Sequence, residues 1–209
     1  MKQKKGLLFI IAAPSGGGKT SLVNRLLEDD AQLKLSISHT TRPPRPAEIH
    51  GEHYYFITTQ EFEMMIQEHQ FVEYATVFDA LYGTSREQIQ KPLEEGLDVI
   101  LEIDWQGAQQ VRRQFSEVVS IFILPPSYEV LERRLRTRAQ DDAATIERRM
   151  QKARNEILHC GEFDFIVFND VFEDCLNQLK MIISTERLRY EQQCWRSASR
   201  MSSLLESDR

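Results

Sequence analysis

A run of small residues followed by a lysine and a threonine gives this sequence its clearest chemical signal. The run is Ala13-Pro14-Ser15-Gly16-Gly17-Gly18-Lys19-Thr20, and an apolar segment precedes it directly. Glycine adopts positive φ angles that turn backbone N–H groups toward one point and lets the backbone approach phosphate oxygens closely. A helix beginning here adds its positive N-terminal end, the lysine adds a cation, and the threonine offers a hydroxyl to Mg²⁺. The run predicts a loop that binds a polyphosphate.

One position departs from the common form of such loops, G-x-x-x-x-G-K-[ST], because Ala13 stands at the first glycine. The alternative interpretation is a tight strand-to-helix turn with a chance lysine. The apolar strand before the loop, the helical pattern after it and the lysine–threonine pair favour the phosphate loop.

Two carboxylates end a second apolar segment. Glu102 and Asp104 close the run Leu97–Asp104 and lie two residues apart, hence on one face of a strand. The C-terminal ends of parallel strands share one sheet edge, where ligands gather. These acids could hold Mg²⁺-bound water or accept hydrogen bonds from a substrate. The alternative is strand termination by polar residues.

Apolar runs of strand length predict the elements that position these groups. They are nearly continuous, as expected for strands buried on both faces, and segments of helical period lie between them. The runs are Leu7–Ala13, Leu97–Ile103, Val118–Leu124 and Phe163–Phe168. Strands alternating with helices predict an α/β fold with a parallel sheet.

Two stretches interrupt this rhythm. Residues 36–90 contain short polar segments and a proline-rich link, which predicts a small inserted lobe. Residues 128–154 carry eight Lys or Arg against five Asp or Glu, so they are locally basic. From Trp195 the chain is rich in Ser and Arg, which predicts a frayed helix or tail.

Composition restricts the class of protein. A chain of 209 residues permits one domain, and its net charge of −6 argues against general binding to nucleic acid or anionic membranes. No apolar run approaches the roughly 18 residues of a membrane span. Lysines before Leu7 imitate a secretory signal, but a buried first strand is the favoured interpretation. Cys160, Cys175 and Cys194 are scattered, which predicts reduced thiols and a cytoplasmic protein.

With these residues in view, the chain resembles the guanylate kinase family over nearly its whole length. The motifs that carry the resemblance are the glycine loop, Ser38-His39-Thr40-Thr41-Arg42-Pro43-Pro44-Arg45, Gly51-Glu52-His53-Tyr54, Tyr82-Gly83-Thr84 and Ile103-Asp104-Trp105-Gln106-Gly107. The resemblance implies a P-loop NTPase fold with a three-layer parallel-sheet core. It also implies Mg²⁺-dependent, in-line phosphoryl transfer from ATP to GMP, and to dGMP, in guanine nucleotide metabolism.

The resemblance further implies a division of the single domain, residues 1–209. Residues of about 1–35, 87–125 and 160–195 would form the core, and about 36–86 would bind GMP. Residues of about 126–159 would form a helical lid over ATP, followed by a tail from about 195 to 209. The oligomeric state stays open.

Particular residues receive roles from the same resemblance. The ATP-binding set is Pro14, Ser15, Gly16, Gly17, Gly18, Lys19, Thr20, Ser21 and Asn169. The GMP-binding set is Ser38, Arg42, Arg45, Tyr54, Glu73, Tyr82, Thr84 and Asp104. The catalytic set is Lys19, Arg42, Arg134, Arg138 and Arg149, with Thr20 on Mg²⁺ and Glu102 reaching the metal through water.

The chemistry of these side chains agrees with those roles. Guanine presents N1–H and N2–H₂ as adjacent donors, which suit the carboxylates Glu73 and Asp104, whereas adenine presents an acceptor at N1. Arginine forks pair bidentately with phosphate oxygens. Arg134 and Arg138 lie four residues apart on one expected helix, where like charges repel unless an anion lies between them. Arg133, Arg136 and Arg148 are interpreted as solvated neighbours.

Three positions depart from the family pattern, and two rival functions remain. Glu102 stands where aspartate is usual, Thr84 where serine is frequent, and Ala139 where glycine is common. One rival is a guanylate-kinase-like interaction module that binds phosphorylated peptides, although such a module is expected to lack the loop lysine and lid arginines. The other is a P-loop kinase for a different nucleotide or a sugar phosphate. His50 and His53 are interpreted as solvated and not as zinc ligands.

Overall fold

The core of the protein is a sheet of five parallel strands in a computed structural model that describes residues 6–77, 79–138 and 143–206. The spatial order is β2-β7-β1-β8-β9, so the first strand lies in the middle. The strands are β1 (Leu8–Ala12), β2 (Leu33–Leu35), β7 (Asp98–Glu102), β8 (Val118–Leu124) and β9 (Phe165–Phe168). The expected α/β class and parallel sheet are confirmed.

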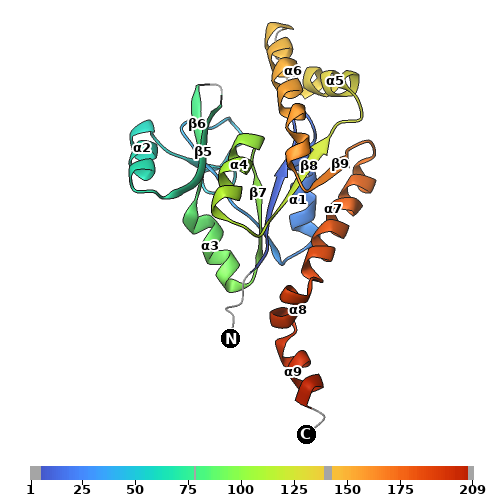
Figure 1. Ribbon diagram of the computed structural model, residues 1–209. Helices are drawn as coiled ribbons and strands as arrows, with labels where there is room; N and C mark the ends of the chain where they lie inside the picture. The colour runs from blue at the N-terminus through green and yellow to red at the C-terminus, as the bar shows by residue number, and fades with distance from the viewer. Residues whose placement is uncertain (1–5, 78, 139–142, 207–209) are drawn as a thin grey trace.

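Helices cover both faces of this sheet, which gives three layers (Figure 1). Phe9 and Ile11 of β1 pack in one apolar cluster with α1 (Lys19–Asp29) and α7 (Phe172–Arg187). Leu8, Ile10 and Ala12 pack in the other with α3 (Arg86–Glu95) and α4 (Trp105–Gln114). Because alternate side chains of β1 enter two different cores, every position of the strand is apolar.

Strand boundaries differ slightly from the predicted ones. Each observed strand lies within or overlaps its apolar run, but β9 starts two residues after Phe163, behind a short 3₁₀ turn at Cys160–Glu162. Strand β2 was not predicted. It has three residues, of which only Leu33 is buried, so it lacks a recognisable period.

A second, four-stranded sheet lies beside the core in the order β4-β3-β6-β5. Its elements are β3 (His39–Thr40), β4 (Tyr55–Phe56), α2 (Thr59–Gln67), β5 (Phe71–Val77) and β6 (Ala80–Ser85). Thr58 and Glu61 form a capping box at the start of α2. Gly83 is needed because a Cβ there would lie 2.9–3.0 Å from the rings of Phe71 and Phe62.

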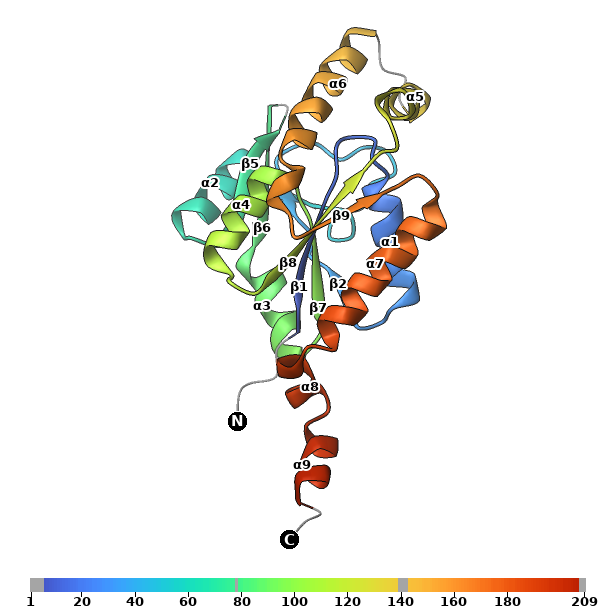
Figure 2. The same ribbon diagram turned by 45° about the vertical axis from the view of Figure 1, so that its right-hand side comes forward.

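Two helices stand together beyond one end of the core sheet (Figures 1 and 2). They are α5 (Tyr128–Arg138) and α6 (Ala143–Leu158), and they share a small apolar cluster of Leu131, Leu135, Ile146, Met150 and Ala153. The second sheet and this helix pair fall within the ranges expected for a GMP-binding region and a lid, but that division stays a prediction.

The C-terminal segment is helical, which agrees with the first of the two expected alternatives, a frayed helix or a tail. Helix α8 (Tyr190–Arg196) and helix α9 (Ala198–Glu206) extend away from the body of the molecule (Figures 1 and 2). None of the helices in the described ranges combines the length and apolarity needed to cross a membrane.

A buried carboxylate ties this segment to the core. Asp98 opens β7 with 0% exposure, and its Oδ1 accepts a hydrogen bond from the Leu7 backbone N at 2.7 Å. Its Oδ2 accepts from Arg187 Nε at 2.6 Å, and Arg196 contacts the same carboxylate. The start of two central strands and the end of the chain therefore meet at one ionic cluster.

We expect Asp98→Ala to lower the free energy of unfolding by about 3–5 kcal/mol, because it leaves two arginines without their buried partner. Urea denaturation followed by circular dichroism measures this change. Asp29→Ala is the matched control, since Asp29 also pairs with two cations, Arg25 and Lys180, but at the surface. Equal losses in both variants would contradict a special role for burial.

Candidate functional site

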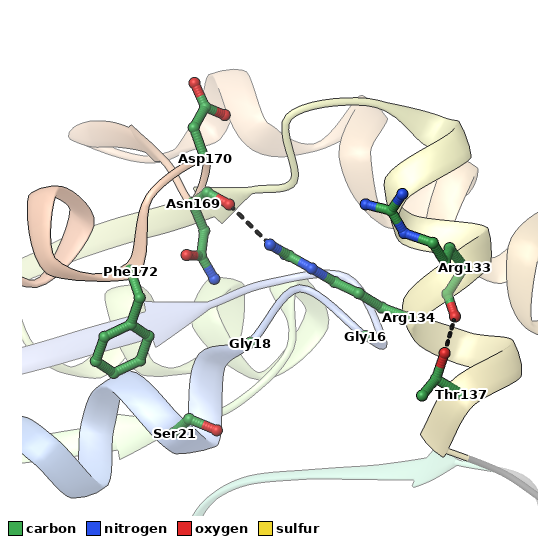
Figure 3. A pocket seen from close by; sticks show the side chains of 9 residues that line it. All are labelled: Gly16, Gly18, Ser21, Arg133, Arg134, Thr137, Asn169, Asp170 and Phe172. Atoms are coloured by element: carbon green, nitrogen blue, oxygen red, sulfur yellow. Dashed lines mark hydrogen bonds between the residues drawn. The ribbon is translucent and has the colours of Figure 1, made fainter.

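The predicted phosphate loop lies between two cavities at the C-terminal edge of the core sheet. The larger one, of about 610 Å³, is bounded by the loop, the ends of β1 and β7, the second sheet and α6. The smaller one, of about 510 Å³, lies on the other side of the loop against α5 and the residues that follow β9 (Figure 3). Gly16 and Gly18 line both cavities.

Most of the predicted site residues line one of these cavities. In the larger cavity they are Pro14, Ser15, Gly16, Gly17, Gly18, Lys19, Thr20, Ser38, Arg45, Tyr54, Glu73, Tyr82, Glu102, Asp104 and Arg149. In the smaller one they are Gly16, Gly18, Ser21, Arg134 and Asn169. Arg42 and Thr84 contact the lining residues Tyr82 and Glu73. Arg138 ends α5, but its side chain and Ala139 lie outside the described residues.

The loop has the backbone geometry that its glycines predict. Gly16 and Gly18 have φ angles of 87° and 91°, a region that L-residues rarely adopt. A Cβ on Gly18 would also lie 2.4 Å from Asn169 Nδ2. Ala13 replaces the usual first glycine without strain, because among the described non-glycine residues positive φ occurs only at His69 and Asp79.

Bonds from three directions fix the loop. Gly17 N donates to Pro14 O at 2.8 Å across the turn, and Gly17 O accepts from Asn169 Nδ2 at 2.8 Å. Ser15 N donates to Glu156 Oε2 of α6 at 3.1 Å. The loop is therefore held in one shape by residues far away in the sequence.

The loop lysine and threonine face the carboxylate edge of β7. Lys19 Nζ donates to Ile103 O at 3.2 Å, and Thr20 Oγ1 donates to Glu102 Oε1 at 2.5 Å. The contact follows from the sheet register, which pairs Ile11 at the end of β1 with Glu102. The longer glutamate still reaches the threonine, so hydroxyl and carboxylate oxygens lie together beside an ammonium group.

A buried acid forms the opposite wall of the larger cavity. Glu73 is only 5% exposed, and its Oε1 accepts a hydrogen bond from Thr84 Oγ1 at 2.6 Å. The two residues are direct partners across β5 and β6, and Ser38 Oγ lies 3.4 Å from the same hydroxyl. Burial, assisted by the charge of Asp104, raises the pKa of Glu73 to about 7. Asp104 itself caps α4 by accepting from Gly107 N at 3.0 Å.

Basic and phenolic groups form a third cluster. Arg42 Nε donates to Tyr82 OH at 3.1 Å, and its Nη2 donates to Glu48 Oε1 at 2.8 Å. The same guanidinium lies 5.6 Å from the centre of the Tyr54 ring. Burial raises the pKa of Tyr54 to about 12, so its hydroxyl stays a hydrogen-bond donor at neutral pH. Glu48, which the sequence interpretation missed, takes one nitrogen of the Arg42 guanidinium, and the Pro43 backbone oxygen accepts from the other at 2.7 Å.

Two of the predicted catalytic arginines lie next to the loop, Arg149 on α6 and Arg134 on α5. Arg149 Nη2 donates to Ser15 Oγ at 3.0 Å, and Arg134 Nη2 donates to the backbone oxygen of Asn169 at 3.1 Å (Figure 3). Within the described chain, Arg134 Nη1 is buried without a hydrogen-bond partner, which leaves a donor for an anion.

The arginines interpreted as solvated neighbours, Arg133, Arg136 and Arg148, are all exposed, and two of them also border a cavity. Arg148 lines the larger cavity together with Lys152, and Arg133 lines the smaller one. The spacing of Arg148 and Lys152 on one helical face was the available signal. Arg136 does stay at the surface, where it pairs with Glu132.

The smaller cavity has an aromatic wall that sequence reasoning missed. The residue is Phe172, which begins α7 and lines this cavity together with Asn169, Asp170 and Ser21 (Figure 3). The Asn169 amide nitrogen is committed to Gly17 O, so a ligand here would meet the phenyl ring and the remaining amide oxygen.

The two loop histidines make local contacts. His50 Nδ1 accepts from Phe56 N at 3.2 Å, and His53 Nδ1 accepts from Ile49 N at 3.1 Å. In the described part of the chain no group of three or more His, Cys, Asp or Glu is placed to hold a metal ion.

Comparison with known proteins gives consistent matches to one family. A family model described as guanylate kinase matches residues 5–186. The guanylate kinase of Methylobacillus flagellatus is 53% identical over 201 residues, which cover 96% of this chain and 100% of that protein. The guanylate kinase of Methylococcus capsulatus is 50% identical, with 96% and 98% covered. The crystal structure of guanylate kinase from Anaplasma phagocytophilum superposes with a TM-score of 0.75 at 31% identity, covering 90% of this chain and 89% of that chain.

We expect Gly18→Ala to weaken binding of inorganic tripolyphosphate by about tenfold or more. A side chain at this positive φ costs about 1–2 kcal/mol, and it also collides with the Asn169 amide. Titration calorimetry measures the affinity. Gly161→Ala is the control, because a Cβ there meets nothing within 4 Å. Equal affinities for the two variants would show that the loop does not bind the phosphates.

Proposed function

The chain belongs to the guanylate kinase family. From that premise we propose which of its residues bind the two substrates and which catalyse transfer of the phosphoryl group between them. The protein is a kinase that phosphorylates GMP to GDP with ATP as the phosphoryl donor. The observation that carries the assignment of roles is the placement of the loop between two cavities, one with a buried acid and one with an aromatic wall.

ATP binds along the loop from the side of the smaller cavity. Its adenine packs near Phe172 and Asn169, and its phosphates meet the loop, the N-terminus of α1 and Lys19. Arg134 supports this placement, because its buried Nη1 supplies an unused donor beside the loop. Ser21, Arg133 and Thr137 complete the lining.

GMP binds in the larger cavity with its base against the acid. Ionised Glu73 accepts from the guanine N1–H and N2–H₂, with Asp104, Ser38 and Thr84 as further partners. Adenine would place an acceptor against this carboxylate and leave it unpaired, which costs about 1–3 kcal/mol. The contacts address the base and the phosphate, so dGMP serves as a second substrate.

The GMP phosphate binds to Arg42, Arg45, Tyr54 and Tyr82. Arg42 now donates from Nη2 to the Glu48 carboxylate, and a phosphate oxygen would take the place of this carboxylate oxygen. The protonated Tyr54 hydroxyl adds a neutral donor. This arrangement leaves the phosphate between the base-binding acid and the loop.

Transfer of the phosphoryl group then depends on alignment and charge stabilisation. The nucleophile is an oxygen of the GMP phosphate, so no general base is required. Lys19 and Arg149 stabilise charge on the transferring group. Arg134 and Arg138 of α5 add to this stabilisation when the helix closes over ATP. Closure of α5 and α6 excludes water, which would otherwise compete as the acceptor.

Mg²⁺ fits the pair formed by Thr20 and Glu102. Magnesium prefers oxygen ligands and takes only one or two from a protein, the rest being phosphate and water oxygens. The hydroxyl and carboxylate lie 2.5 Å apart beside Lys19, where such an ion would neutralise phosphate charge. Thr20 would bind the metal and Glu102 would hold its water.

The two rival functions differ in their demands on these residues. A phosphopeptide-binding module needs neither the loop lysine nor the arginines of a lid. In this chain Lys19 contacts the Ile103 backbone oxygen, and Arg149 contacts the Ser15 hydroxyl. A kinase for another acceptor does not need a buried carboxylate at Glu73. A coupled ADP-release assay with GMP, AMP, UMP and dGMP separates these functions. The free cysteines Cys160, Cys175 and Cys194 support a reducing compartment, and we place the enzyme in the cytoplasm.

We expect Lys19→Ala to lower kcat by at least about a hundredfold, because the positive charge beside the terminal phosphates is lost. GMP affinity stays within about twofold in calorimetry, since the base site is unchanged. Lys34→Ala on β2, an exposed lysine, is the control and keeps normal turnover. Near-normal turnover of the Lys19 variant would refute the assignment.

We expect Glu73→Gln to raise KM for GMP by about tenfold while KM for ATP changes little, because only the guanine loses its charged acceptor. Wild-type kcat/KM for GMP should fall about tenfold per pH unit below pH 7, as Glu73, with its raised pKa, takes up a proton. The Gln variant lacks this part of the pH dependence. A variant profile that overlays the wild-type one would rule out Glu73 as the titrating group.

A further inference from the structure

Helix α6 contacts the phosphate loop through one charged face. Arg149, Lys152 and Glu156 are spaced at i, i+3 and i+7, which places them on one side of the helix. Two of them bind the same loop residue. Arg149 Nη2 donates to Ser15 Oγ at 3.0 Å, while Glu156 Oε2 accepts from Ser15 N at 3.1 Å.

The carboxylate in this set stands against the expected chemistry of the site. Glu156 is 7% exposed, and a buried acid beside a polyphosphate loop repels the ligand that the loop binds. Burial raises the pKa of Glu156, while the nearby Lys152, at 3.6 Å, and the Ser15 N–H favour its ionised form. Because the negative charge of Glu156 weakens phosphate binding, a role of this residue that favours binding must arise from something other than that charge.

The role follows from the planarity of one peptide bond. The N–H of Ser15 and the C=O of Pro14 belong to the same rigid unit, and they point in opposite directions. Glu156 holds the N–H end, and Gly17 N donates to the C=O end at 2.8 Å. Fixing the first end therefore directs the carbonyl that closes the turn at Gly17.

This arrangement separates the N–H groups of the loop into two sets. Those of Ser15 and Gly17 are committed to protein acceptors. The turns at Gly16 and Gly18 have positive φ, and α1 begins immediately after them, so its first N–H groups lack intrahelical acceptors. The second set can bind phosphate only while the first set keeps the loop in shape.

Glu156 also lies near the fixed end of its helix. Helix α6 ends two residues later at Leu158, and His159 stacks on Trp105 at the start of α4 with 3.4 Å between ring centres. Arg149 lies two turns farther out. A swing of the lid would move Arg149 over a larger arc than Glu156, so the bond to Ser15 N can persist.

We propose that Glu156 is a positioning residue that orients the Pro14–Ser15 peptide, so that the remaining loop amides converge on the ATP phosphates. The proposal deepens the function above and rests on the loop being the ATP site. Glu156 borders the larger cavity, and its proposed effect is exerted through the backbone of Ser15 and not through contact with a substrate.

The test compares Glu156→Ala, Glu156→Gln and Glu147→Ala in the full-length protein. The Ala variant should lower kcat/KM for ATP by about tenfold to a hundredfold, because a loop displaced by less than 1 Å misaligns the phosphates. KM for GMP should change less than about twofold. The Gln variant should recover most of the loss, since its amide oxygen still accepts from Ser15 N. Glu147, exposed on the same helix, is the neutral control.

Calorimetric titration with ATP alone and thermal unfolding complete the design. Weaker ATP binding in the Ala variant at an unchanged melting temperature supports the proposal. Tighter ATP binding would overturn it, because the carboxylate would then only repel phosphate. A Gln variant as impaired as the Ala variant would also overturn it. If the Ala variant unfolds, the Gln variant decides by the same kcat/KM measurement.

The outcomes also separate this proposal from the proposed function. Wild-type protein that fails to release ADP with GMP would disprove the function itself. Wild-type protein that turns over normally, alongside an Ala variant with normal ATP kinetics, would disprove only the role of Glu156.

Discussion

Holding several backbone N–H dipoles toward one point is the constraint on which the rest of this structure depends. Like-oriented dipoles repel until an anion arrives, so the loop needs support from outside itself. The positive φ angles of Gly16 and Gly18 permit the shape, and they do not maintain it. Its maintenance comes from Asn169 at the end of β9 and from Glu156 on α6, two elements that are distant in sequence and adjacent in the fold. The parallel sheet matters to function because its C-terminal edge collects these supports around the end of β1.

The site must bind two anionic substrates although the protein itself carries a net negative charge, so cations are concentrated there. A chain of net charge −6 gathers Lys19, Arg45 and Arg149 around the larger cavity, where phosphates must approach each other. Glu73 is the exception, and in the proposed roles it gives selectivity for the base. Burial raises the pKa of Glu73, because the carboxylate loses its contact with water. A base with two adjacent N–H donors would replace the lost hydrogen bonds. The same burial that disfavours the free carboxylate therefore increases the penalty for a mismatched base.

The sequence was informative where contributing residues are close together in the chain. The glycine loop, the acids after β7 and the continuous apolar strands are local patterns, and the structure brings most of the implied site residues to two neighbouring cavities. It was uninformative where a role arises from tertiary contact. Glu156 lies 141 positions from Ser15, and Glu48 acts through its ion pair with Arg42. Phe172 is one apolar residue among many in the sequence, and only its place beside the loop identifies it as a cavity wall. Strand β2 was too short to show a period, and from Trp195 the composition left a frayed helix and a tail both open, where the chain forms α9.

The ionic cluster at Asp98 has a consequence for synthesis of the chain. Its carboxylate lies at the start of β7, whereas its partners Arg187 and Arg196 are 89 and 98 residues downstream. While the ribosome is still translating the C-terminal helices, this acid has no cation to accompany it into the protein interior, and long-range contacts of this kind form late. The central sheet therefore reaches its final packing only after Arg187 and Arg196 have emerged from the ribosome and paired with Asp98.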